Sequence, residues 1–593
     1  MVASRLFDFL TENLKSRPIG DTLAGKENGQ WRKYSTAEVF ETVCELSCGL
    51  LRKGMSLQDG SVEGRDKIAL ISKNCPEWIM LDHAVQRIGA VLTPIYPTIS
   101  TNELQFILSD AKVKIVFVHD AELYDKVLSI KDQLSDLLEV YTFLKLEHAP
   151  FWKDLLIKDE QLNEEVNLIS DKIRSEDIAT IIYTSGTTGK PKGVMLSHKN
   201  ILSNVIDSTP AFPKGENFRA LSFLPLNHIF EKMITYLYLY NGTAIYYAES
   251  MDKIADNLRE INPDLFSTVP RLLEKVYERI MVKGSELKGI KKGLFFWAHK
   301  LASRYEINKD LGFIYNMQLA IANKLIFNKW REALGNRIVC IVSGGAACQP
   351  RLIKIFTAAK IPILEGYGLT ETSPVISVNR MNVTDRYFGT VGPLIDNVSV
   401  RIAEDGEILC KGPNIMMGYY KNPELTAENV VDGWFKTGDI GEMVEGRFLK
   451  ITDRKKEIFK TSGGKYVAPM VIENKLKESR FIENIMVTGA GKKFVSALIV
   501  PSLSNLNIYC NEHNIPVQDP INLVKNKKVI EYYQSIVTHY NESFNHVEQI
   551  KKFQLLPKEW SVEGGELTPK LSLKRKVIEQ KYAQELLEIY DQS

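Results

Sequence analysis

The sequence has almost no net charge and very little cysteine. Its 593 residues carry 75 lysines and arginines against 73 aspartates and glutamates, which gives a net charge of +2. Proteins that bind nucleic acid usually show a basic excess, so no nucleic-acid partner is expected. The seven cysteines are odd in number and sparse, and no C-x-x-C pair occurs. Neither a disulfide framework nor a structural zinc site is expected, which favours a reducing, cytoplasmic compartment.

Long hydrophobic runs are also missing. A membrane-spanning helix needs ~20 apolar residues, and the nearest approach, Met233–Ala248, is split by Asn241 and Gly242. The first 18 residues contain no long apolar stretch, so no signal peptide is expected. We therefore expect a soluble or peripheral protein. A chain of this length exceeds what one hydrophobic core organises and predicts at least two domains.

Three familiar motifs of catalytic sites are absent as well. The pattern G-x-x-x-x-G-K-[ST] needs a hydroxyl residue after its lysine, whereas Lys190 is followed by Pro191. The pattern G-x-G-x-x-G fails at its nearest approach, residues 366–368, because the sixth position is Glu371. No G-x-S-x-G occurs. These absences disfavour an ordinary kinase or GTPase, a Rossmann dehydrogenase and a hydrolase with a serine nucleophile.

The most informative feature that is present is the segment Tyr183–Gly193, YTSGTTGKPKG. It follows an apolar run, Ile178–Tyr183, that is typical of a strand. Glycines let backbone N–H groups face a ligand, hydroxyls add donors and lysines add positive charge. The pattern predicts a strand that ends in a polyphosphate-binding loop, and the alternative is a surface turn. The candidate contacts are Thr184, Ser185, Gly186, Thr187, Thr188, Gly189 and Lys192.

Short apolar runs alternate with helical patterns between about Asp66 and Thr370. This alternation predicts parallel, doubly wound sheets, whose ligands bind beyond the C-terminal ends of the strands. Ser100 and Glu103 predict a capping box at the start of one helix. The expected strands are Lys67–Ser72, Ala90–Tyr96, Val113–His119, Ile178–Thr184, Ala220–Leu224, Asp264–Val269, Arg337–Ser343 and Ile361–Glu365.

The pattern changes after Glu371. Short strand candidates separated by turns predict a small β-rich unit, and they are Val398–Ala403, Glu407–Cys410 and Arg447–Ile451. The charge run Asp453–Glu457 follows, which by itself indicates a solvated linker or helix face. The predicted fold class is α/β. Doubly wound subdomains and the β-rich unit form a large N-terminal region, and a smaller, mobile α+β domain follows.

Five segments together resemble the adenylate-forming superfamily, which includes acyl-CoA synthetases, luciferases and peptide-synthetase adenylation domains. The first is the loop at Tyr183–Gly193. The others follow in the family's order, as Tyr367-Gly-Leu-Thr-Glu371, Thr437-Gly-Asp439, Asp453-Arg454 through Gly463-Gly464-Lys465, and Leu567-Thr-Pro-Lys570. The resemblance covers the chain from about residue 30. It implies an N-terminal domain at residues 1–452, a hinge at 453–456 and a mobile C-terminal domain at 457–593.

The resemblance assigns nucleotide-binding roles. Glu371 and Thr184 would be ligands of a Mg²⁺ ion that bridges the phosphates of ATP, and Thr370 would support them. Without the family, Glu371 is an ordinary surface carboxylate. Asp439, otherwise a turn residue, would accept both ribose hydroxyls, with Arg454 nearby. The ring of Tyr367 would lie against adenine, and the other expected nucleotide contacts are Gly344, Gly345, Ala346, Glu365, Gly366 and Gly368.

The resemblance also implies the chemistry. Lys570 would reach across the domain cleft to the reacting carboxylate and the α-phosphate, although on its own it belongs to a basic face with Lys574, Arg575 and Lys576. His228, otherwise a core histidine, would position the carboxylate. The expected catalytic residues are Lys570, His228, Glu371 and Lys192.

The second half-reaction would attach the acyl group to CoA. Lys456 occupies the family's hinge position, and hinges absorb backbone changes at a few residues. Gly463 and Gly464 would form part of the pantetheine path, and Lys460 is a further cofactor-binding candidate. The implied cofactors are ATP, Mg²⁺ and CoA.

The acid is expected to be a long-chain fatty acid. LPLNHIFE and DRKKEIFKTSGGKYVAP resemble the long-chain subgroup, and Gly368 stands where acetate-using relatives carry a pocket-filling tryptophan. Residues 288–304 mix lysines with Leu294, Phe295, Phe296 and Trp297. They indicate either a half-buried ordinary helix or a peripheral contact with the inner face of a membrane.

Several alternatives stay open at this point. A fatty acyl-AMP ligase would load an acyl carrier protein instead of CoA, and a noncatalytic nucleotide- and lipid-binding protein is a different class. A light-producing oxygenase shares the fold and the adenylation chemistry. A homodimer is one alternative for the oligomeric state. The preferred chain length does not follow from the sequence.

Overall fold

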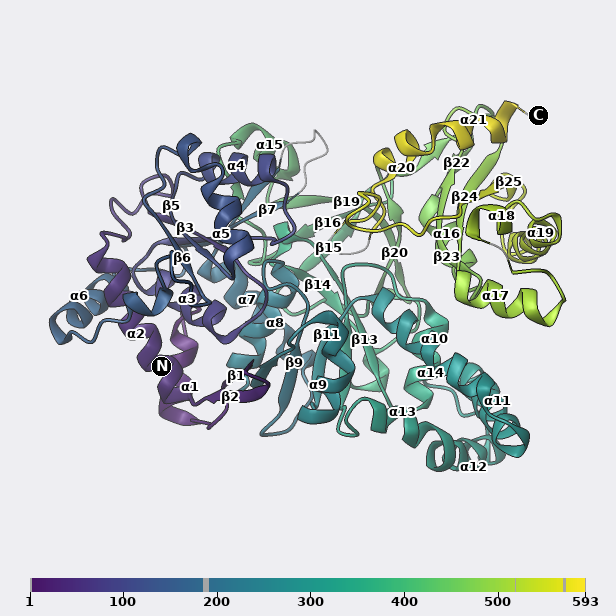
Figure 1. The fold of residues 1–593 in the computed structure, drawn as a ribbon, viewed down its shortest axis with the longest axis horizontal. Coiled ribbons are helices and arrows are strands. Elements are labelled where there is room, and N and C mark those ends of the chain that lie inside the picture. Colours follow the sequence, from purple (N-terminus) through teal and green to yellow (C-terminus); the bar gives the residue numbers. More distant parts are fainter. Residues whose placement is uncertain (1–2, 185–190, 518, 569–571, 592–593) are drawn as a thin grey trace.

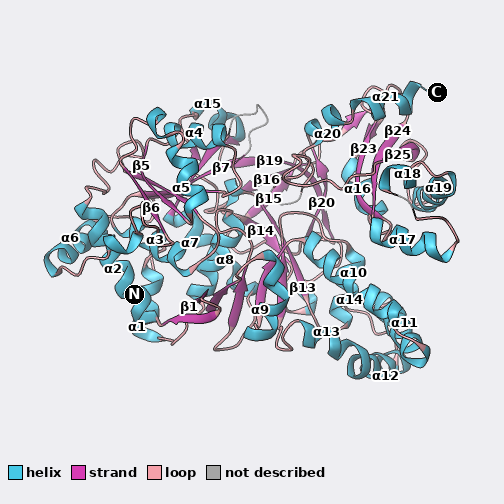
Figure 2. Ribbon diagram, viewed as in Figure 1, coloured by secondary structure: helices cyan, strands magenta, loops and turns pink. Residues whose placement is uncertain are grey.

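The computed structural model describes residues 3–184, 191–517, 519–568 and 572–591. A large N-terminal region, purple to green in Figure 1, contains two mixed sheets and a β-rich unit, and a smaller C-terminal region, green to yellow, lies beside it. Helices flank the two large sheets (Figure 2). Within the described residues no helix is long and apolar enough to cross a membrane.

The first large sheet has seven strands in the order β17-β8-β7-β4-β3-β5-β6. Strands β3 to β7 are parallel, whereas β8 and β17 are antiparallel. Every residue of β3 and β4 is buried, as expected for strands covered on both faces. The bounds are β3 (Lys67–Ile71), β4 (Val91–Ile95), β5 (Val113–Val118), β6 (Glu139–Thr142), β7 (Ile178–Thr184), β8 (Lys192–Ser197) and β17 (Gly418–Tyr419).

The second large sheet has eight strands in the order β14-β13-β12-β11-β9-β10-β1-β2. Its inner strands are parallel, and β2 and β14 close the two edges in antiparallel pairs. The bounds are β1 (Leu23–Glu27), β2 (Gln30–Tyr34), β9 (Arg219–Ser222), β10 (Ala244–Tyr247), β11 (Leu265–Thr268), β12 (Cys340–Ser343), β13 (Ile363–Gly368) and β14 (Val375–Val378). The predicted α/β class and its eight strands are confirmed, although both sheets are mixed at their edges.

Several helices of this region begin at side-chain caps. Ser100 caps α4, because its Oγ accepts a hydrogen bond of 3.3 Å from the N–H of Glu103. Glu103 in turn accepts from the Ser100 hydroxyl at 2.8 Å, not from the backbone N–H of a full capping box. The bounds are α1 (Asp8–Ser16), α2 (Thr36–Arg52), α3 (Pro76–Arg87), α4 (Thr101–Asp110), α5 (Ala121–Leu128), α6 (Glu160–Ser170), α7 (His198–Ser208), α8 (Ile229–Tyr240), α9 (Ile254–Ile261), α10 (Pro270–Glu286), α11 (Gly289–Ser303), α12 (Phe313–Ala322), α13 (Asn328–Ala333) and α14 (Pro350–Ala358).

Short helical turns join these elements. The ones that matter below are η3, which follows α7, the π-turn η5, which continues α12, and η6, which carries Glu371. The bounds are η1 (Lys131–Gln133), η2 (Trp152–Leu155), η3 (Thr209–Ala211), η4 (Met251–Lys253), η5 (Asn323–Phe327), η6 (Thr370–Thr372) and η7 (Val383–Asp385).

The β-rich unit predicted after Glu371 is a five-stranded sheet. Its long strand β19 pairs with β16, β18 and β20. The bounds are β15 (Ser399–Ile402), β16 (Glu407–Lys411), α15 (Pro423–Asn429), β18 (Val430–Val431), β19 (Trp434–Val444) and β20 (Phe448–Arg454).

The C-terminal region has its own core around a three-stranded sheet and a short hairpin. Arg271 of α10 forms an ion pair with Glu483 of β23, and Gln349 donates to the carbonyl oxygen of Lys477 at 3.1 Å. These contacts join it to the N-terminal region. The bounds are β21 (Phe459–Lys460), β22 (Tyr466–Val467), α16 (Pro469–Leu476), β23 (Ile482–Thr488), β24 (Val495–Pro501), α17 (Leu503–Glu512), α18 (Pro520–Leu523), α19 (Lys527–Asn541), β25 (Ile550–Leu555), α20 (Arg575–Lys581) and α21 (Ala583–Asp591).

Candidate active site

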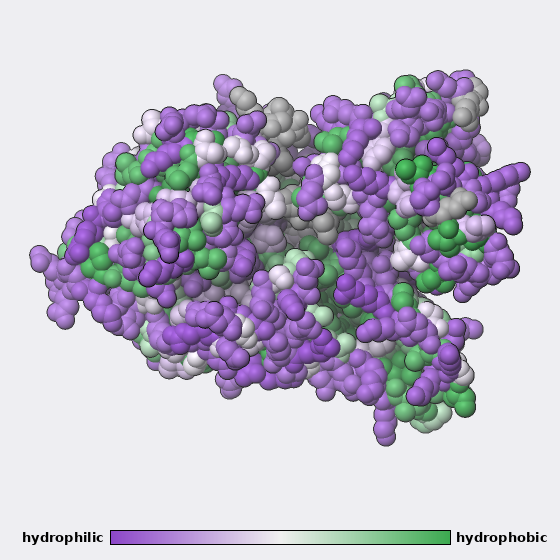
Figure 3. Space-filling model, viewed as in Figure 1, coloured by the Kyte–Doolittle hydropathy of each residue, from purple (hydrophilic) through white to green (hydrophobic). Residues whose placement is uncertain are grey.

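A cavity of about 1730 Å³ lies where the two large sheets, the β-rich unit and the C-terminal region meet. Figure 3 shows the surface hollowed between the N-terminal and C-terminal regions. The lining includes Thr184 from the first sheet, Tyr367 from the second, Asp439 from the β-rich unit and Thr568 from the C-terminal region. The fold therefore brings together residues that are widely separated in the sequence.

The hairpin of β7 and β8 carries the glycine-rich loop. Thr184 pairs with Lys192 across its base, and both residues line the cavity. The Oγ1 atom of Thr184 is buried and has no hydrogen-bond partner among the described residues. Burying such a hydroxyl unpaired costs roughly 1–3 kcal/mol, so a ligand that bonds it is favoured. The other predicted loop contacts, Ser185, Gly186, Thr187, Thr188 and Gly189, lie outside the described residues.

Lys192 and Glu371 form an ion pair at this end of the cavity. The Nζ atom of Lys192 lies 2.9 Å from Oε1 of Glu371 and donates to the hydroxyl of Tyr419 at 2.8 Å. The Tyr419 hydroxyl donates to the same carboxylate oxygen at 2.9 Å. Only 9 % of the Glu371 side chain is exposed, against 30 % of that of Lys192. The carboxylate is thus held in place, while the ammonium stays accessible to an anion.

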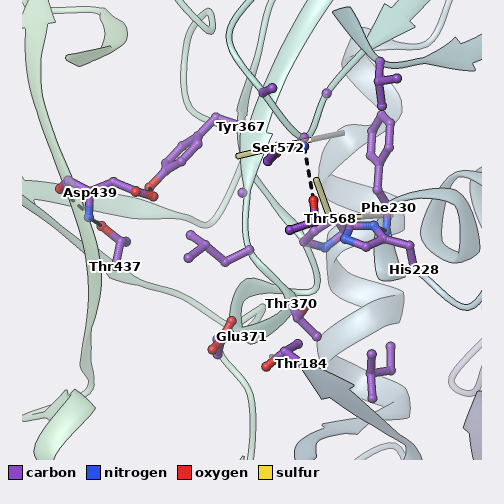
Figure 4. A pocket seen from close by; sticks show the side chains of 18 of the residues that line it. Thr184, His228, Phe230, Tyr367, Thr370, Glu371, Thr437, Asp439, Thr568 and Ser572 are labelled. Atoms are coloured by element: carbon purple, nitrogen blue, oxygen red, sulfur yellow. Dashed lines mark hydrogen bonds between the residues drawn. The ribbon is translucent and has the colours of Figure 1, made fainter. Parts of the chain in front are cut away.

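The donor set at this end fits the expected Mg²⁺ ion. Mg²⁺ is usually held by one or two carboxylates together with substrate phosphates. Figure 4 shows Thr184, Thr370 and Glu371 at the same end of the cavity. A buried carboxylate and a hydroxyl without a partner among the described residues are oxygen donors of the required kind. Their role as metal ligands stays a prediction.

Tyr367 and Asp439 meet on the opposite side of the cavity (Figure 4). The Tyr367 hydroxyl donates to Oδ2 of Asp439 at 2.7 Å, and Nε of Arg454 lies 3.2 Å from Oδ1. Asp439 and Arg454 are paired across β19 and β20. Burial raises the pKa of Asp439, while Arg454 and Tyr367 oppose that shift. Both oxygens predicted to accept ribose hydroxyls therefore have protein partners, which a nucleotide would have to share or displace.

The predicted small residues line the cavity between these two ends. They are Gly344, Gly345, Ala346, Gly366 and Gly368. Gly344 follows β12 and packs under the ring of Phe230, where an added Cβ would lie 2.9 Å from the ring. A Cβ on Gly368 would lie 1.7 Å from the carbonyl oxygen of Pro374. A side chain at 368 would therefore require the backbone at Pro374 to shift, so glycine here serves local packing as well as any room for the acid.

Glu365, also predicted to contact the nucleotide, has a different environment. Its side chain is buried and accepts a hydrogen bond of 3.0 Å from the backbone N–H of Cys348. Burial raises the pKa of this carboxyl to about 8. Glu365 is not among the residues that line the cavity. This hydrogen bond holds the backbone at Cys348, two residues after Ala346.

His228 caps α8 and faces the cavity. Its Nδ1 accepts a hydrogen bond of 3.1 Å from the N–H of Phe230, which fixes the ring at the start of the helix. Thr568 and Ser572 line the same cavity and are drawn beside His228 in Figure 4. These two residues bond each other, through the N–H of Ser572 and the Thr568 Oγ1 at 3.1 Å. Lys570 lies outside the described residues, and its catalytic role stays a prediction.

A buried carboxyl that the sequence did not single out holds the first turn of α8. Glu231 accepts hydrogen bonds from the hydroxyls of Ser222, at 2.7 Å, and Ser267. These serines lie on the neighbouring strands β9 and β11. Burial raises the pKa of Glu231 to about 7. The network fixes α8, and with it His228, against the end of the second sheet.

The start of α20 is anchored by Arg575, a second residue that sequence reasoning missed. Arg575 donates to both carboxylate oxygens of Glu473 at 2.7 Å and to Glu457 at 2.9 Å. Glu457 immediately follows the predicted hinge. No local pattern marks Arg575 among the basic residues near the C-terminus, because its partners Glu473 and Glu457 lie 102 and 118 positions away in the chain.

The predicted hinge residues begin within a strand. Asp453 and Arg454 end β20, and buried Asp453 accepts from the N–H of Met470 at 3.1 Å. Lys455 pairs with Glu407 at 2.7 Å. Lys456 lines the cavity. The remaining CoA candidates, Lys460, Gly463 and Gly464, are exposed and are not lining residues in this arrangement.

An apolar arm of the cavity follows one face of α8. Met233, Ile234, Leu237 and Tyr238 recur at helical spacing along it. This i, i+1, i+4, i+5 repeat was visible in the sequence, but it did not indicate a cavity instead of a core. The arm is completed by Ser208, Ala211, Phe212, Pro213, Leu265, Cys340, Val342, Leu364, Val375 and Val378.

Comparisons with known proteins identify the family of this chain. Residues 11–420 match the family model of the AMP-binding enzyme, and residues 456–593 match that of the AMP-binding enzyme C-terminal domain. The long-chain-fatty-acid–CoA ligase FadD15 of Mycobacterium bovis is 32 % identical, over 95 % of this chain and 93 % of its own length. Long chain acyl-CoA synthetase 3 of Arabidopsis thaliana is 29 % identical, over 98 % and 91 %. The structure of a Mycobacterium tuberculosis fatty acyl CoA synthetase has a TM-score of 0.61 at 19 % identity, covering 98 % of this chain and 99 % of the other.

Proposed function

The chain belongs to the AMP-binding enzyme family, and we propose that it is a long-chain fatty acid–CoA ligase. It activates a fatty carboxylate with ATP to an acyl adenylate and pyrophosphate, and then transfers the acyl group to CoA. The observation that carries the proposal is a continuous cavity that joins a phosphate end to an apolar arm. His228 stands between them, at the start of the helix that lines the arm.

The first half-reaction must bring an anionic carboxylate to an anionic triphosphate. Lys192, at the phosphate end, supplies positive charge, and Lys570 is the proposed second cation. Preorganised charge of this kind is usually the largest catalytic contribution. His228 orients the carboxylate, which would also lie at the positive end of the α8 dipole. A Mg²⁺ ion held by Glu371 and Thr184 would neutralise charge on the phosphates when bound.

The nucleotide would occupy the side of the cavity opposite the acid. Tyr367 would cover the base, and Asp439 with Arg454 would hold the ribose. The small side chains of Gly344, Gly345 and Ala346 leave room for a flat ring beside the backbone. Because Asp439 already bonds Tyr367, ribose binding would rearrange that contact instead of filling an unused carboxylate.

The apolar arm supports a long chain and suggests its length. Tyr238 lies ten residues beyond His228 on α8, which corresponds to about 15 Å. An extended alkyl chain advances about 1.3 Å per carbon, so roughly twelve carbons reach Tyr238. Phe212 packs edge-on against Tyr238, with 6.4 Å between the ring centres. We therefore place the preferred acids near twelve to fourteen carbons, an order-of-magnitude length that rests on helix rise.

The second half-reaction needs a different arrangement of the two domains. Here Thr568 and Ser572 line the cavity, whereas the turn at Gly463 and Gly464 lies outside it. The proposal is that residues 457–593 rotate on a hinge at 453–456 relative to residues 1–452. The rotation withdraws the Lys570 segment and brings Lys460 and the glycine turn to the pantetheine path.

The proposal also includes the acceptor of the acyl group and the cellular location of the protein. CoA is favoured over a carrier protein because the two relatives named above, matched over 93 % and 91 % of their own length, are named as a CoA ligase and an acyl-CoA synthetase. The protein would act in the cytoplasm and bind peripherally to the inner face of a membrane, into which long-chain acids partition.

A thioester assay across acids from acetate to a twenty-carbon acid tests the function. The expected result is acyl-CoA formation with AMP and pyrophosphate, strongest near the length of the arm. Substituting a holo-acyl carrier protein, with a free phosphopantetheine thiol, for CoA provides the comparison. Thioester formation only on the carrier protein would replace the proposed function with that of a fatty acyl-AMP ligase. Pyrophosphate release that does not depend on the acid would contradict both the CoA ligase and the acyl-AMP ligase functions.

A further inference from the structure

Helix α12 and its continuation η5 expose a row of large apolar side chains. The exposed fractions are 82 % for Phe313, 67 % for Ile314, 48 % for Met317, 43 % for Ile321 and 51 % for Leu325. We call these five residues the α12 face. Figure 3 shows hydrophobic residues gathered over α11 and α12, at the lower right of the molecule. Exposed apolar patches of this kind usually mark a binding surface.

The α12 face is not the core side of an ordinary amphipathic helix. The core side of the same helix consists of Tyr315, Ala322 and Phe327, which are buried. The whole segment Phe313–Phe327, FIYNMQLAIANKLIF, has one charged residue, Lys324. A helix that is apolar around most of its circumference is normally covered on all sides. Here one side is covered by the protein and the other faces solvent.

Helix α11 extends this surface. The hydroxyl of Tyr315 donates to the carbonyl oxygen of Leu301 at 2.9 Å, which joins the two helices. Ile290 of α11 is 83 % exposed and Phe296 is 38 % exposed. Phe295, by contrast, is buried and packs against Trp330. The segment 288–304, expected from its sequence to be either half-buried or interfacial, is therefore half-buried and contributes only the edge of an exposed face that lies mainly on α12.

The charge around this surface is strongly positive. Residues 288–325 contain seven lysines and arginines but two acidic residues, Glu306 and Asp310. Both acidic side chains are engaged, Glu306 with Lys354 and Asp310 with the N–H of Gly312. The basic residues are exposed, and none forms an ion pair with another described residue; they are Lys288, Lys291, Lys292, Lys300, Arg304, Lys309 and Lys324.

We propose that the α12 face docks on the surface of an anionic lipid bilayer. Apolar side chains flanked by lysines are the features by which a peripheral helix enters the interface and attracts acidic headgroups. A second copy of this chain is a poorer occupant, because a two-fold contact would place the seven basic residues against themselves. The purpose of docking rests on the proposed function, since a long-chain acid partitions into bilayers.

Vesicle co-sedimentation without ATP, acid or CoA tests the proposal. We expect the protein to sediment with vesicles of phosphatidylglycerol and phosphatidylcholine, and far less with phosphatidylcholine alone. Ile314→Asp with Met317→Asp should weaken binding at least about tenfold, because each exposed side chain buries apolar area in the bilayer. Lys291→Gln, Lys292→Gln and Lys324→Gln together should weaken it roughly a hundredfold, about fivefold per lysine. All five positions are exposed, so the fold should persist.

Leu168→Asp is the matched control, because Leu168 is 65 % exposed on α6, outside this surface. Its binding should equal that of the unmodified protein. Absent vesicle binding, or equal binding by the Ile314/Met317 variant, would overturn the proposal. So would a lipid-independent dimer, seen by analytical ultracentrifugation, that the same variant dissociates. Acyl-CoA formation from a soluble short acid is measured separately, so loss of the proposed function and loss of docking are distinguishable.

Discussion

The ammonium of Lys192 lies 2.9 Å from the carboxylate of Glu371, although 179 positions separate the two residues in the chain. Both also bond the hydroxyl of Tyr419, at 2.8 and 2.9 Å. Lys192 begins the strand after the glycine-rich loop, and Glu371 lies in the turn after β13. The contact therefore joins the edges of the two large sheets where the cavity needs both a cation and an oxygen ligand.

Glu371→Gln should abolish most adenylate formation. A neutral amide is a weak Mg²⁺ ligand. Loss of an outer-shell partner of a metal ligand already costs about 10- to 100-fold in affinity or activity, so loss of the ligand should cost at least about 100-fold. Acid-dependent pyrophosphate release measures the effect. Glu424→Gln, exposed on α15, is the control and should stay within about twofold of the unmodified rate. A Glu371→Gln enzyme with the unmodified rate would remove Glu371 from the metal site.

Lys456→Pro should separate the two half-reactions. Proline fixes φ and restricts the residue before it, which would limit rotation at the proposed hinge. We expect acyl-AMP formation to change little and acyl-CoA formation to fall at least about tenfold. Single-turnover assays of each product measure the split, with Lys456→Ala as the control that loses the charge but keeps the backbone free. Equal losses of both products in Lys456→Pro would contradict the hinge.

Tyr238→Ala should lengthen the preferred acyl chain. Removing the ring opens the end of the apolar arm, and each additional buried methylene is worth about fourfold. The ratio of rates for a sixteen-carbon and a fourteen-carbon acid should rise by up to about sixteenfold, about fourfold for each of the two methylenes. Because the ratio is taken within one protein, a general loss of stability does not affect it. Tyr240→Ala, at the end of the same helix but outside the lining, should leave the ratio unchanged. An unchanged ratio in Tyr238→Ala would show that Tyr238 does not close the apolar arm.

Glu231 should make stability depend on pH. Burial raises its pKa to about 7, against about 4.3 in an unfolded chain. Between these values the folded protein binds more protons than the unfolded chain, so stability falls as the pH rises. The loss of folding free energy through this window is about 4 kcal/mol. Glu231→Gln keeps a neutral group at every pH, and it should therefore remove this contribution.

Thermal unfolding of both proteins at about pH 5 and about pH 7.5 measures the effect of Glu231. The unfolding temperature of the unmodified protein should fall more between these two conditions than that of Glu231→Gln. Parallel changes in the two proteins would show that the carboxyl is not protonated in the folded state. The same pair of proteins also reports on positioning, because a shift of His228 should raise the KM for the acid without changing that for ATP.

The sequence predicted the fold and much of the site because both leave local patterns. Buried parallel strands are continuous apolar runs, and the glycine-rich loop is a dense cluster of donors. Roles for Asp439, Arg454 and Glu371 came from resemblance, and the structure brings them to one cavity. Arg575 could not be found in this way, because its partners are remote in sequence. Glu231 was missed because the sequence does not show that the strands carrying Ser222 and Ser267 lie side by side. The α12 face was also missed, since exposure depends on which side of a helix the rest of the chain covers.

The most direct test of the account is a single incubation of the protein with a twelve- to fourteen-carbon fatty acid, ATP, Mg²⁺ and CoA, with all products quantified by mass spectrometry. The account predicts acyl-CoA, AMP and pyrophosphate in equal amounts, acyl-AMP when CoA is left out, and no product without the acid. Formation of ADP instead of AMP, or AMP release that does not depend on the acid, would contradict it.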